Sequence, residues 1–419
     1  MSMSHYQSDR LHMEQVSIAD LAKAIPTPFY CYSQSQIETQ YKAYRDNLSS
    51  LDAQVCYALK ANSNQAVIKV LADLGAGADV VSEGELRRAL MAGITADKIV
   101  YSGVAKTASD IAYALEQDIL QFNVESMNEL EQINRTALTM NTKARVAFRI
   151  NPDVDAGTHE KISTGKAENK FGIPISQAPE IYQMASQLPG ISIQGVDMHI
   201  GSQLTQLQPY DTAFNLLIDL VQQLREQGHP ISHIDLGGGL GVSYTAENSA
   251  PSIADYCQRI SELLKDWDGK VILEPGRSLV AESGWLVSQV VYIKQGQERT
   301  FCIIDAAMND LLRPSMYGAV HDIIPDKQTS ELQTYDIVGP VCETGDTFAK
   351  NYRMACVGEG DLVAMTYAGA YGAVMSSTYN TRLLVPEVLI KGDQYQVIRQ
   401  RTDYQSLIKM DNLADWQSD

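Results

Sequence analysis

The 419-residue sequence lacks an uninterrupted apolar run near the ~20 residues that a membrane-spanning helix needs. Residues 1–17 have neither the basic start nor the apolar stretch of a secretory signal. Basic residues are also scarce, with 33 Lys and Arg against 51 Asp and Glu, which gives a net charge of −18. Because so acidic a surface would repel nucleic acid and anionic lipid, we expect a protein that binds neither. The missing signal pattern and the scattered cysteines lead us to expect a cytoplasmic protein.

Patterns typical of metal and dinucleotide sites are missing as well. The six cysteines form no CxxC pair and no zinc spacing, and there is no HExxH or His-x-His. The one glycine run fails the Gly-x-Gly-x-x-Gly fingerprint, because Val242 occupies the third glycine position. We therefore expect no metal, and we expect five of the cysteines to be ordinary reduced thiols. Cys342 is the exception for reasons given below.

Strand and helix patterns alternate between about residues 40 and 280. The predicted strands are residues 55–59, 78–81, 99–101, 119–124, 145–150, 192–199, 234–236 and 271–273, and each precedes a helix or a long loop. A doubly wound sheet also alternates in this way, but eight similarly spaced repeats favour a TIM-like (β/α)₈ barrel. The sequence therefore predicts an α/β fold with a barrel over residues 37–283.

The later part of the chain is rich in strand patterns and poor in helical ones. Predicted strands cover residues 285–293, 300–304, 335–338, 361–367 and 387–390. They predict a separate C-terminal β-rich, barrel-like domain over residues 284–419. The aromatic, alternating segment Pro28–Tyr32 has the same character, so we expect residues 13–36 to join this domain.

Unusual residues follow several predicted barrel strands, at the ends where barrel enzymes carry their chemistry. They are Lys60 after the first strand, Asp79 in the second, His199 and Ser202 after the sixth, Gly237–Gly239 after the seventh, and Glu274, Gly276 and Arg277 after the eighth. Their convergence on one rim predicts an active site there.

Each of these residues has a structural and a functional interpretation. Lys60 is either a surface lysine or an amine made nucleophilic by apolar surroundings, as a Schiff-base lysine requires. Gly237–Gly239 is either a turn or a backbone cradle for phosphate. Glu274 either pairs with Arg277 or keeps a pyridine nitrogen protonated. His199 is a core residue, a metal ligand with Asp197, or a ring that stacks on an aromatic cofactor, and the last suits it best.

Four motifs together resemble the alanine-racemase-like class of pyridoxal-phosphate (PLP) decarboxylases, over nearly the whole chain. They are Tyr57–Asn62, His199–Gln203, Gly237–Gly239 and Glu274–Arg277, in that order and spacing. The resemblance implies a PLP-binding barrel with a C-terminal β-domain. It also implies roles in cofactor binding: Lys60 attaches PLP beside Asp79, His199 stacks on the ring, Glu274 meets the pyridine nitrogen, and Ser202, Gly239, Gly276, Arg277 and Tyr371 surround the phosphate.

Later motifs resemble the diaminopimelate decarboxylases of that class. They are Asn169–Gly172, Asp305–Asp310, Arg313–Ala319 with His321, Cys342–Asp346 with Thr344 for the usual Ser, and Ala370–Gly372. By resemblance, the substrate contacts Arg277, Arg313, Tyr317, Glu343 and Tyr371, and Cys342 donates a proton in the partner's site of a homodimer. One departure is Leu383-Leu384, where the family has Pro-Arg.

The expected function is therefore PLP-dependent decarboxylation of meso-2,6-diaminopimelate to L-lysine and CO₂, the last step of lysine biosynthesis. A distal carboxylate needs positive charge, which Arg313 can supply, whereas ornithine has no such carboxylate. One alternative is a decarboxylase of ornithine, arginine or a carboxylated polyamine. A regulatory homologue without catalysis is another, although Lys60, Cys342 and Asp346 are all present. The third is a metal-dependent barrel hydrolase that uses His199 and Asp197.

Overall fold

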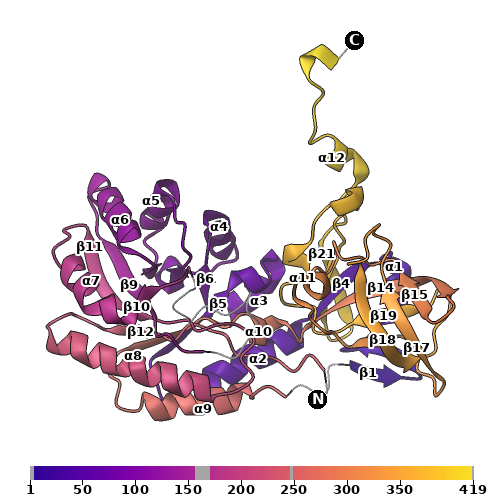
Figure 1. Ribbon diagram of the computed structural model, residues 1–419, viewed down its shortest axis with the longest axis horizontal. Helices are drawn as coiled ribbons and strands as arrows, with labels where there is room; N and C mark the ends of the chain where they lie inside the picture. The colour runs from indigo at the N-terminus through magenta and orange to yellow at the C-terminus, as the bar shows by residue number, and fades with distance from the viewer. Residues whose placement is uncertain (1–3, 156–169, 246–248, 418–419) are drawn as a thin grey trace. The chain divides into compact units, whose positions relative to one another are not determined.

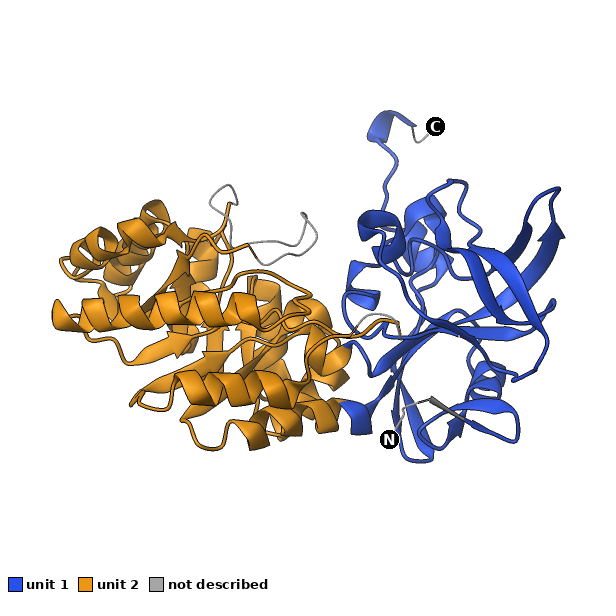
Figure 2. Ribbon diagram, turned by 60° about the horizontal axis from the view of Figure 1, so that its bottom comes forward, with its two compact units in different colours: residues 1–36, 281–419 blue, residues 37–280 orange. Residues whose placement is uncertain are grey.

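The computed structural model describes residues 4–155, 170–245 and 249–417. The chain divides into two compact units, one of residues 37–280 and one of residues 1–36 with 281–419 (Figure 2). The sequence analysis placed the corresponding boundary after residue 283. Each unit is considered by itself below.

The first unit is a closed parallel barrel (Figure 1), which confirms the predicted fold class. Among the described residues its eight strands are β5 (Ala53–Ala58), β6 (Gly77–Val80), β7 (Ile99–Tyr101), β8 (Gln121–Val124), β9 (Ala144–Asn151), β11 (Ile191–Asp197), β12 (His233–Asp235) and β13 (Lys270–Leu273). Each pairs with the next in parallel, and β13 pairs with β5 to close the ring. A short strand, β10 (Ile173–Pro174), extends the sheet beside β9.

Helices follow the barrel strands along the chain. They are α3 (Gln65–Asp73), α4 (Glu83–Met91), α5 (Ala108–Gln117), α6 (Met127–Thr139), α7 (Ala178–Ala185), α8 (Gln208–Glu226), α9 (Ile253–Leu263) and α10 (Arg277–Val280), and α2 (Gln34–Asn47) precedes the first barrel strand. Ser82 and Ser126 are the N-caps of α4 and α6, and the side chain of each accepts a hydrogen bond from the backbone N–H of the third residue after it. The carboxylates of Glu85 and Glu129 accept hydrogen bonds from the backbone N–H groups of Val81 and Glu125, which lie one position before each cap.

The second unit is built from β-strands. Its larger sheet contains β4 (Phe29–Ser33), β14 (Gly284–Gln295), β15 (Thr300–Ile304), β16 (Ile323–Pro325), β17 (Leu332–Val338), β18 (Thr347–Ala355), β19 (Leu362–Met365), β20 (Glu387–Lys391) and β21 (Gln394–Arg399). Strands β1 (Ser4–Gln7), β2 (Arg10–Met13) and β3 (Val16–Ser17) form a small sheet, and the helices are α1 (Ile18–Ala24), α11 (Arg313–Tyr317) and α12 (Tyr404–Ile408).

Strand β4 explains why the N-terminal segment belongs to this second unit. It lies between β14, to which it is antiparallel, and β20, to which it is parallel. Phe29 and Cys31 point into an apolar core with Trp285, Val287 and Val388. The aromatic, alternating pattern of Pro28–Tyr32 thus corresponds to a strand buried on both faces. Among the residues that the structure describes, no helix has the length and apolar character needed to cross a membrane.

A buried ion pair joins two of the barrel's connecting segments. Lys106 Nζ lies 2.6 Å from Glu129 Oε1, and the two side chains are only 1% and 6% exposed. The ammonium group also donates to the carbonyls of Gly103 and Asn123, both at 2.8 Å. It therefore ties the loop after β7 to β8 and to α6.

We predict that Lys106→Met lowers the free energy of unfolding by about 3 kcal/mol, because it leaves the Glu129 carboxylate buried without its counter-charge. Arg135→Met is the matched control, since Arg135 and Glu131 are a largely exposed pair 3.8 Å apart. The Arg135→Met variant should lower the free energy of unfolding by less than about 1 kcal/mol. Urea unfolding followed by circular dichroism measures both, and equal losses would contradict the prediction.

Candidate active site

Lys60 lies at the mouth of the barrel, in a short 3₁₀ turn (Leu59–Ala61) directly after β5. Its Nζ is 2.8 Å from Oδ2 of Asp79, which belongs to the neighbouring strand β6 and is completely buried. One of the two interpretations of Lys60 placed this amine in apolar surroundings, but its side chain is 39% exposed and faces a carboxylate. The amine is therefore held in place by a charge partner rather than being set apart in an apolar pocket.

Glu274 follows β13 and is held by side chains from two other strands. Its Oε1 accepts from Asn123 Nδ2 at 3.0 Å and from Ser102 Oγ at 3.3 Å. The same Asn123 amide donates to Asp235 Oδ2 at 3.2 Å. The sequence analysis did not single out Ser102, Asn123 or Asp235. A polar residue within or just after an otherwise apolar barrel strand is the signal that would have found them.

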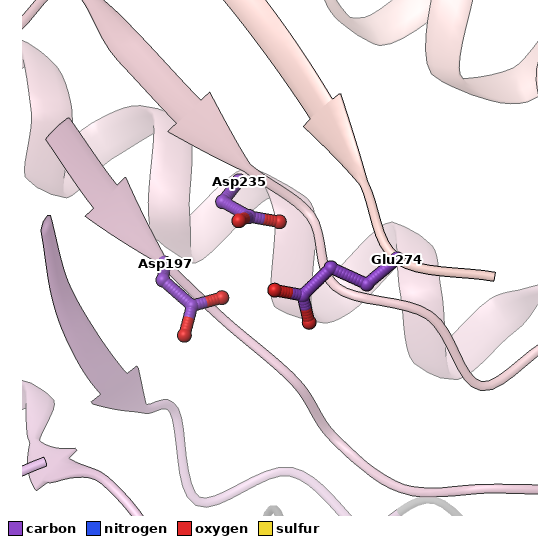
Figure 3. Close-up of side chains that lie close together, drawn as sticks. All are labelled: Asp197, Asp235 and Glu274. Carbon is purple, nitrogen blue, oxygen red and sulfur yellow. The ribbon is translucent and has the colours of Figure 1, made fainter. Parts of the chain in front are cut away.

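Three acidic side chains meet at the ends of consecutive strands β11, β12 and β13 (Figure 3). One carboxylate oxygen from each of Asp197, Asp235 and Glu274 lies within 4.8 Å of the others. Burial, reinforced by the neighbouring carboxylates, raises the pKa of Asp197 and of Glu274 well above the usual values. Burial also raises the pKa of Asp235, to about 6. The pKa values of all three acids are therefore shifted toward the protonated form, because buried carboxyl groups this close together do not all ionise easily.

His199 is not a member of this acidic group, so the described residues do not offer the metal site with Asp197 that we weighed as an alternative. Its Nδ1 accepts from the backbone N–H of Gly238 at 3.2 Å, which leaves the ring hydrogen on Nε2. Burial, with the charges of Arg149 and Lys60, lowers the pKa of the imidazole well below its usual value. His199 is therefore a neutral, flat ring beside the strand ends.

The loops after β11, β12 and β13 pack closely around glycines. A Cβ at Gly238 would lie 2.2 Å from the carbonyl oxygen of Glu274, and one at Gly239 would lie 2.3 Å from that of Gly201. At Gly276, a Cβ would meet the side chain of Ala61 at 3.1 Å. Only glycine allows the backbone to come this close, which is how loops present their N–H groups to an anion.

A guanidinium group adds positive charge beside these glycines. Arg277 donates from Nη2 to Ser202 Oγ at 3.0 Å and from Nη1 to the hydroxyl of Tyr244 at 2.5 Å. Arg277 is buried, and the two contacts join the loops after β11, β12 and β13. Tyr244 was not among the residues selected from the sequence, although it follows the glycine run closely, because only folding brings its hydroxyl to Arg277.

The remaining site residues predicted from the sequence lie in the β-rich unit. Arg313 and Tyr317 begin and end α11, Cys342 is exposed, and Tyr371 has a left-handed backbone with φ of 55°. The carboxylate of Glu343 accepts from the hydroxyl of Tyr379 at 3.0 Å.

Hydrogen bonds connect these elements within the unit. Ser315 Oγ of α11 donates to the carbonyl of Gly345 at 2.5 Å, and the N–H of Cys342 donates to Asn380 Oδ1 at 3.4 Å. Asp346 accepts from the N–H groups of Met308 and Val341, both at 2.7 Å. It therefore pins the turn that carries Cys342 and Glu343.

Local hydrogen bonds hold Leu384 and Gly172, which belong to two further sequence features. Leu384, in the Leu383-Leu384 departure, exchanges hydrogen bonds with Thr402 through its N–H and its carbonyl, so this pair is anchored to the segment before α12. Asn169 lies outside the described residues, while Gly172 of the same motif donates its N–H to Glu125 Oε2 at 2.8 Å.

The fold and these strand-end residues define a class of protein. Residues 34–281 match the family described as "Pyridoxal-dependent decarboxylase, pyridoxal binding domain". A lysine, a buried carboxyl group and a glycine-lined cradle at one barrel rim fit such a domain, and the cofactor of this class is pyridoxal 5′-phosphate.

Comparison with similar proteins identifies the family more closely. The diaminopimelate decarboxylase of Pseudomonas aeruginosa is 48% identical over 414 residues, which is 99% of each chain. The crystal structure of the Helicobacter pylori diaminopimelate decarboxylase complexed with L-lysine aligns with a TM-score of 0.90 and 42% identity, over 94% of this chain and 98% of that one. The enzyme of M. jannaschii, also with L-lysine, aligns at 0.95 and 37% identity over 98% of both chains. The chain therefore belongs to the diaminopimelate decarboxylase family.

The glycine cradle gives a direct test. Gly239→Ala should weaken PLP binding by at least about tenfold, because the added Cβ overlaps the Gly201 carbonyl and shifts the loop. Gly228→Ala is the matched control, since Gly228 also has a positive φ, of 88°, but nothing lies within 4 Å of its added Cβ. It should cost about 1 kcal/mol of stability without changing cofactor affinity. Titration of the visible PLP absorbance measures both, and equal affinities would argue against the cradle.

The acidic group predicts a pH dependence in cofactor-free protein. A carboxyl group whose pKa is raised by folding stabilises the fold at pH values below its ordinary pKa, here 3.8 for Asp197. That stability is lost as the pH rises through the raised pKa. Asp197→Asn removes this loss, so its free energy of unfolding should exceed that of the unmodified protein at pH 8 and approach it at pH 4.

Asp268→Asn is the control for this measurement. Asp268 is exposed, and its hydrogen bond with Arg225 lowers the pKa of the carboxyl group. It should therefore show no gain in stability at high pH. Denaturant unfolding at a series of pH values measures both variants, and parallel curves for Asp197→Asn and the unmodified protein would refute the prediction.

Proposed function

We propose that this chain is a PLP-dependent carboxy-lyase that converts meso-2,6-diaminopimelate to L-lysine and CO₂, the last step of lysine biosynthesis. The observation that carries the proposal is the barrel rim, where the Lys60–Asp79 pair, the proton-holding Glu274 and the Gly237–Gly239 and Arg277 loops meet. Family membership supplies the substrate.

The residues of the rim fit the three unlike parts of PLP. An aldehyde needs an amine, which is Lys60; a pyridine nitrogen needs an acid, which is Glu274; and a phosphate needs an anion cradle, which the glycines and Arg277 provide. When bound, this cofactor supplies an electron-withdrawing ring that takes up the charge left on Cα by the departing CO₂.

The chain's own groups prepare this chemistry. Asp79 orients the amine of Lys60 by accepting from it, and Asn123 with Ser102 fixes the Oε1 of Glu274. The carboxyl group of Glu274 would face the ring nitrogen, share a proton with it and, as a carboxylate, hold that nitrogen protonated. The neutral imidazole of His199 is suited to packing flat against that ring.

Recognition of the distal end of the substrate is assigned to residues of the β-rich unit. Arg313 carries the positive charge that a second carboxylate requires, and Tyr317, Glu343 and Tyr371 complete the contacts. The exposed thiol of Cys342 donates the proton that replaces CO₂, in the site of a second subunit of a homodimer. The cytoplasm is the proposed compartment, and the six free cysteines support it, because thiols stay reduced there.

Ornithine, arginine or a carboxylated polyamine is the alternative substrate class. The buried guanidinium of Arg313 favours diaminopimelate, because ornithine offers no second carboxylate for it to bind. The regulatory alternative is disfavoured by the presence of both Lys60 and Cys342.

The deciding experiment is CO₂ release from PLP-loaded protein given meso-diaminopimelate, ornithine and arginine separately. Release from diaminopimelate alone, with L-lysine as the product, is the expected result. Lys60→Ala should abolish release together with the visible absorbance of the bound cofactor. Release from ornithine or arginine would overturn the proposed substrate, and no release from any of the three by cofactor-loaded protein would favour the regulatory alternative.

Arg313→Ala should raise KM for diaminopimelate by about tenfold or more, because one charge-assisted contact to the distal carboxylate is lost. Steady-state kinetics measures this, with Arg353→Ala as a control, because Arg353 lies on the strand β18 outside the proposed site. An unchanged KM for the Arg313 variant would remove the argument for its role.

A further inference from the structure

His321 is a buried residue between Arg313 and the backbone of Thr366. Its Nε2 lies 2.8 Å from Nη1 of Arg313, and its Nδ1 lies 2.8 Å from the carbonyl oxygen of Thr366. The two side chains belong to residues that are only 2% and 6% exposed. The sequence motif that contains Arg313 also contains His321, but the proposed function gives this histidine no role.

The two contacts determine how the imidazole is protonated. A guanidinium group can only donate hydrogen bonds, and a backbone carbonyl can only accept them. Nε2 must therefore accept from Arg313, and Nδ1 must carry the hydrogen that is donated to Thr366. His321 is consequently the neutral tautomer with its hydrogen on Nδ1.

The anchor of the imidazole is itself fixed by the sheet. His321 lies just before β16 and Thr366 just after β19, two strands that pair antiparallel. Both the N–H and the hydroxyl of Thr366 donate to the carbonyl of Asp322, at 2.9 and 3.1 Å. The end of a β-ladder thus fixes the orientation of the His321 ring. The hydrogen bond that Arg313 donates to this ring in turn fixes the guanidinium group on α11.

We propose that His321 is a positioning residue that orients the guanidinium of Arg313 to bind the carboxylate at the distal end of the substrate. The proposal rests on the role given to Arg313 under the proposed function. Since the guanidinium is rigid and planar, holding one N–H restricts the plane of the whole group. A neutral acceptor does this without cancelling the positive charge, as a carboxylate in the same place would do.

Two amide variants separate this role from simple packing. His321→Gln places an amide oxygen near the position of Nε2, where it can accept from Arg313. His321→Asn is shorter, so its amide can donate to the Thr366 carbonyl but offers Arg313 no acceptor. Both variants are uncharged, and thermal unfolding and cofactor absorbance check that each is folded and loaded.

The readout is competitive inhibition of the PLP-loaded enzyme by two ligands. L-Lysine carries the carboxylate that Arg313 would bind, and 1,5-diaminopentane is the same chain without it. His321→Asn should raise the inhibition constant of L-lysine and KM for diaminopimelate by about tenfold, with kcat and the constant for 1,5-diaminopentane changed less than about threefold. His321→Gln should restore L-lysine inhibition to within about threefold of the unmodified enzyme, because it restores the acceptor.

Thr366→Val is the neighbouring control. It removes the hydroxyl that donates to Asp322 but keeps the carbonyl that His321 uses, so the preference for L-lysine over 1,5-diaminopentane should persist. Equal L-lysine constants for the Asn and Gln variants would overturn the proposal. Parallel weakening of both ligands in the Asn variant would also overturn it, because that pattern indicates packing alone.

Arg313→Ala, measured by the same inhibition assay, distinguishes the role proposed for Arg313 from the role proposed for His321. Unchanged L-lysine inhibition in that variant would refute the role of Arg313 under the proposed function. Weakened inhibition there, with normal inhibition in His321→Asn, would refute only the role of His321. Should His321→Asn fail to fold, His321→Gln decides: a retained preference for L-lysine supports the proposal, and a lost preference overturns it.

Discussion

Closure of the barrel through the pairing of β13 with β5 is the constraint on which the candidate active site depends. Lys60 follows β5 and Glu274 follows β13. The two residues are far apart in the sequence, and the pairing of these strands brings them together. The pairing continues past the strands, because the N–H of Ala58 donates to the carbonyl of Pro275 at 3.1 Å. The amine of Lys60 and the carboxyl group of Glu274 are thereby placed after adjacent strands of one ring, and a slip in this register would move them apart.

The electrostatics of the rim follow from the same closure. Strands of a closed barrel bring their end residues together in a region sheltered from water, and three of these residues are acidic. Mutual repulsion and burial keep protons on the acids, while Asn123 bridges Asp235 and Glu274 with one amide. A pyridine ring withdraws electrons best when its nitrogen is protonated, and a carboxyl group that faces this nitrogen would hold the proton there. The cost of burying these acids in the free protein is therefore linked to the chemistry proposed for the bound cofactor.

Much of this architecture could be predicted from the sequence, because barrel strands and helices carry strong local patterns. The predicted strand 99–101 coincides with β7, and the predicted strand 300–304 coincides with β15 (Thr300–Ile304). Lys60 and Asp79 were both selected from the sequence and lie 2.8 Å apart. Asn123 and Tyr244 were missed, because a single polar residue acquires its meaning only from partners that folding brings near it. The apolar setting that was one interpretation of Lys60 overlooked Asp79 for the same reason, because this partner belongs to another strand.

The division of the chain into two units suggests how one cofactor site can serve several substrates. The groups that prepare the chemistry lie at the ends of barrel strands, where the ladder fixes them. The groups assigned to the distal end of the substrate lie on the short helix α11 and on a turn pinned by Asp346. The positions of these side chains must therefore be fixed by side-chain contacts rather than by a strand ladder. The Arg313–His321–Thr366 chain of hydrogen bonds meets that need, because it connects a residue on a five-residue helix to the end of a paired β-strand. Substrate preference could then change through α11 and its supports, while the barrel chemistry stays the same.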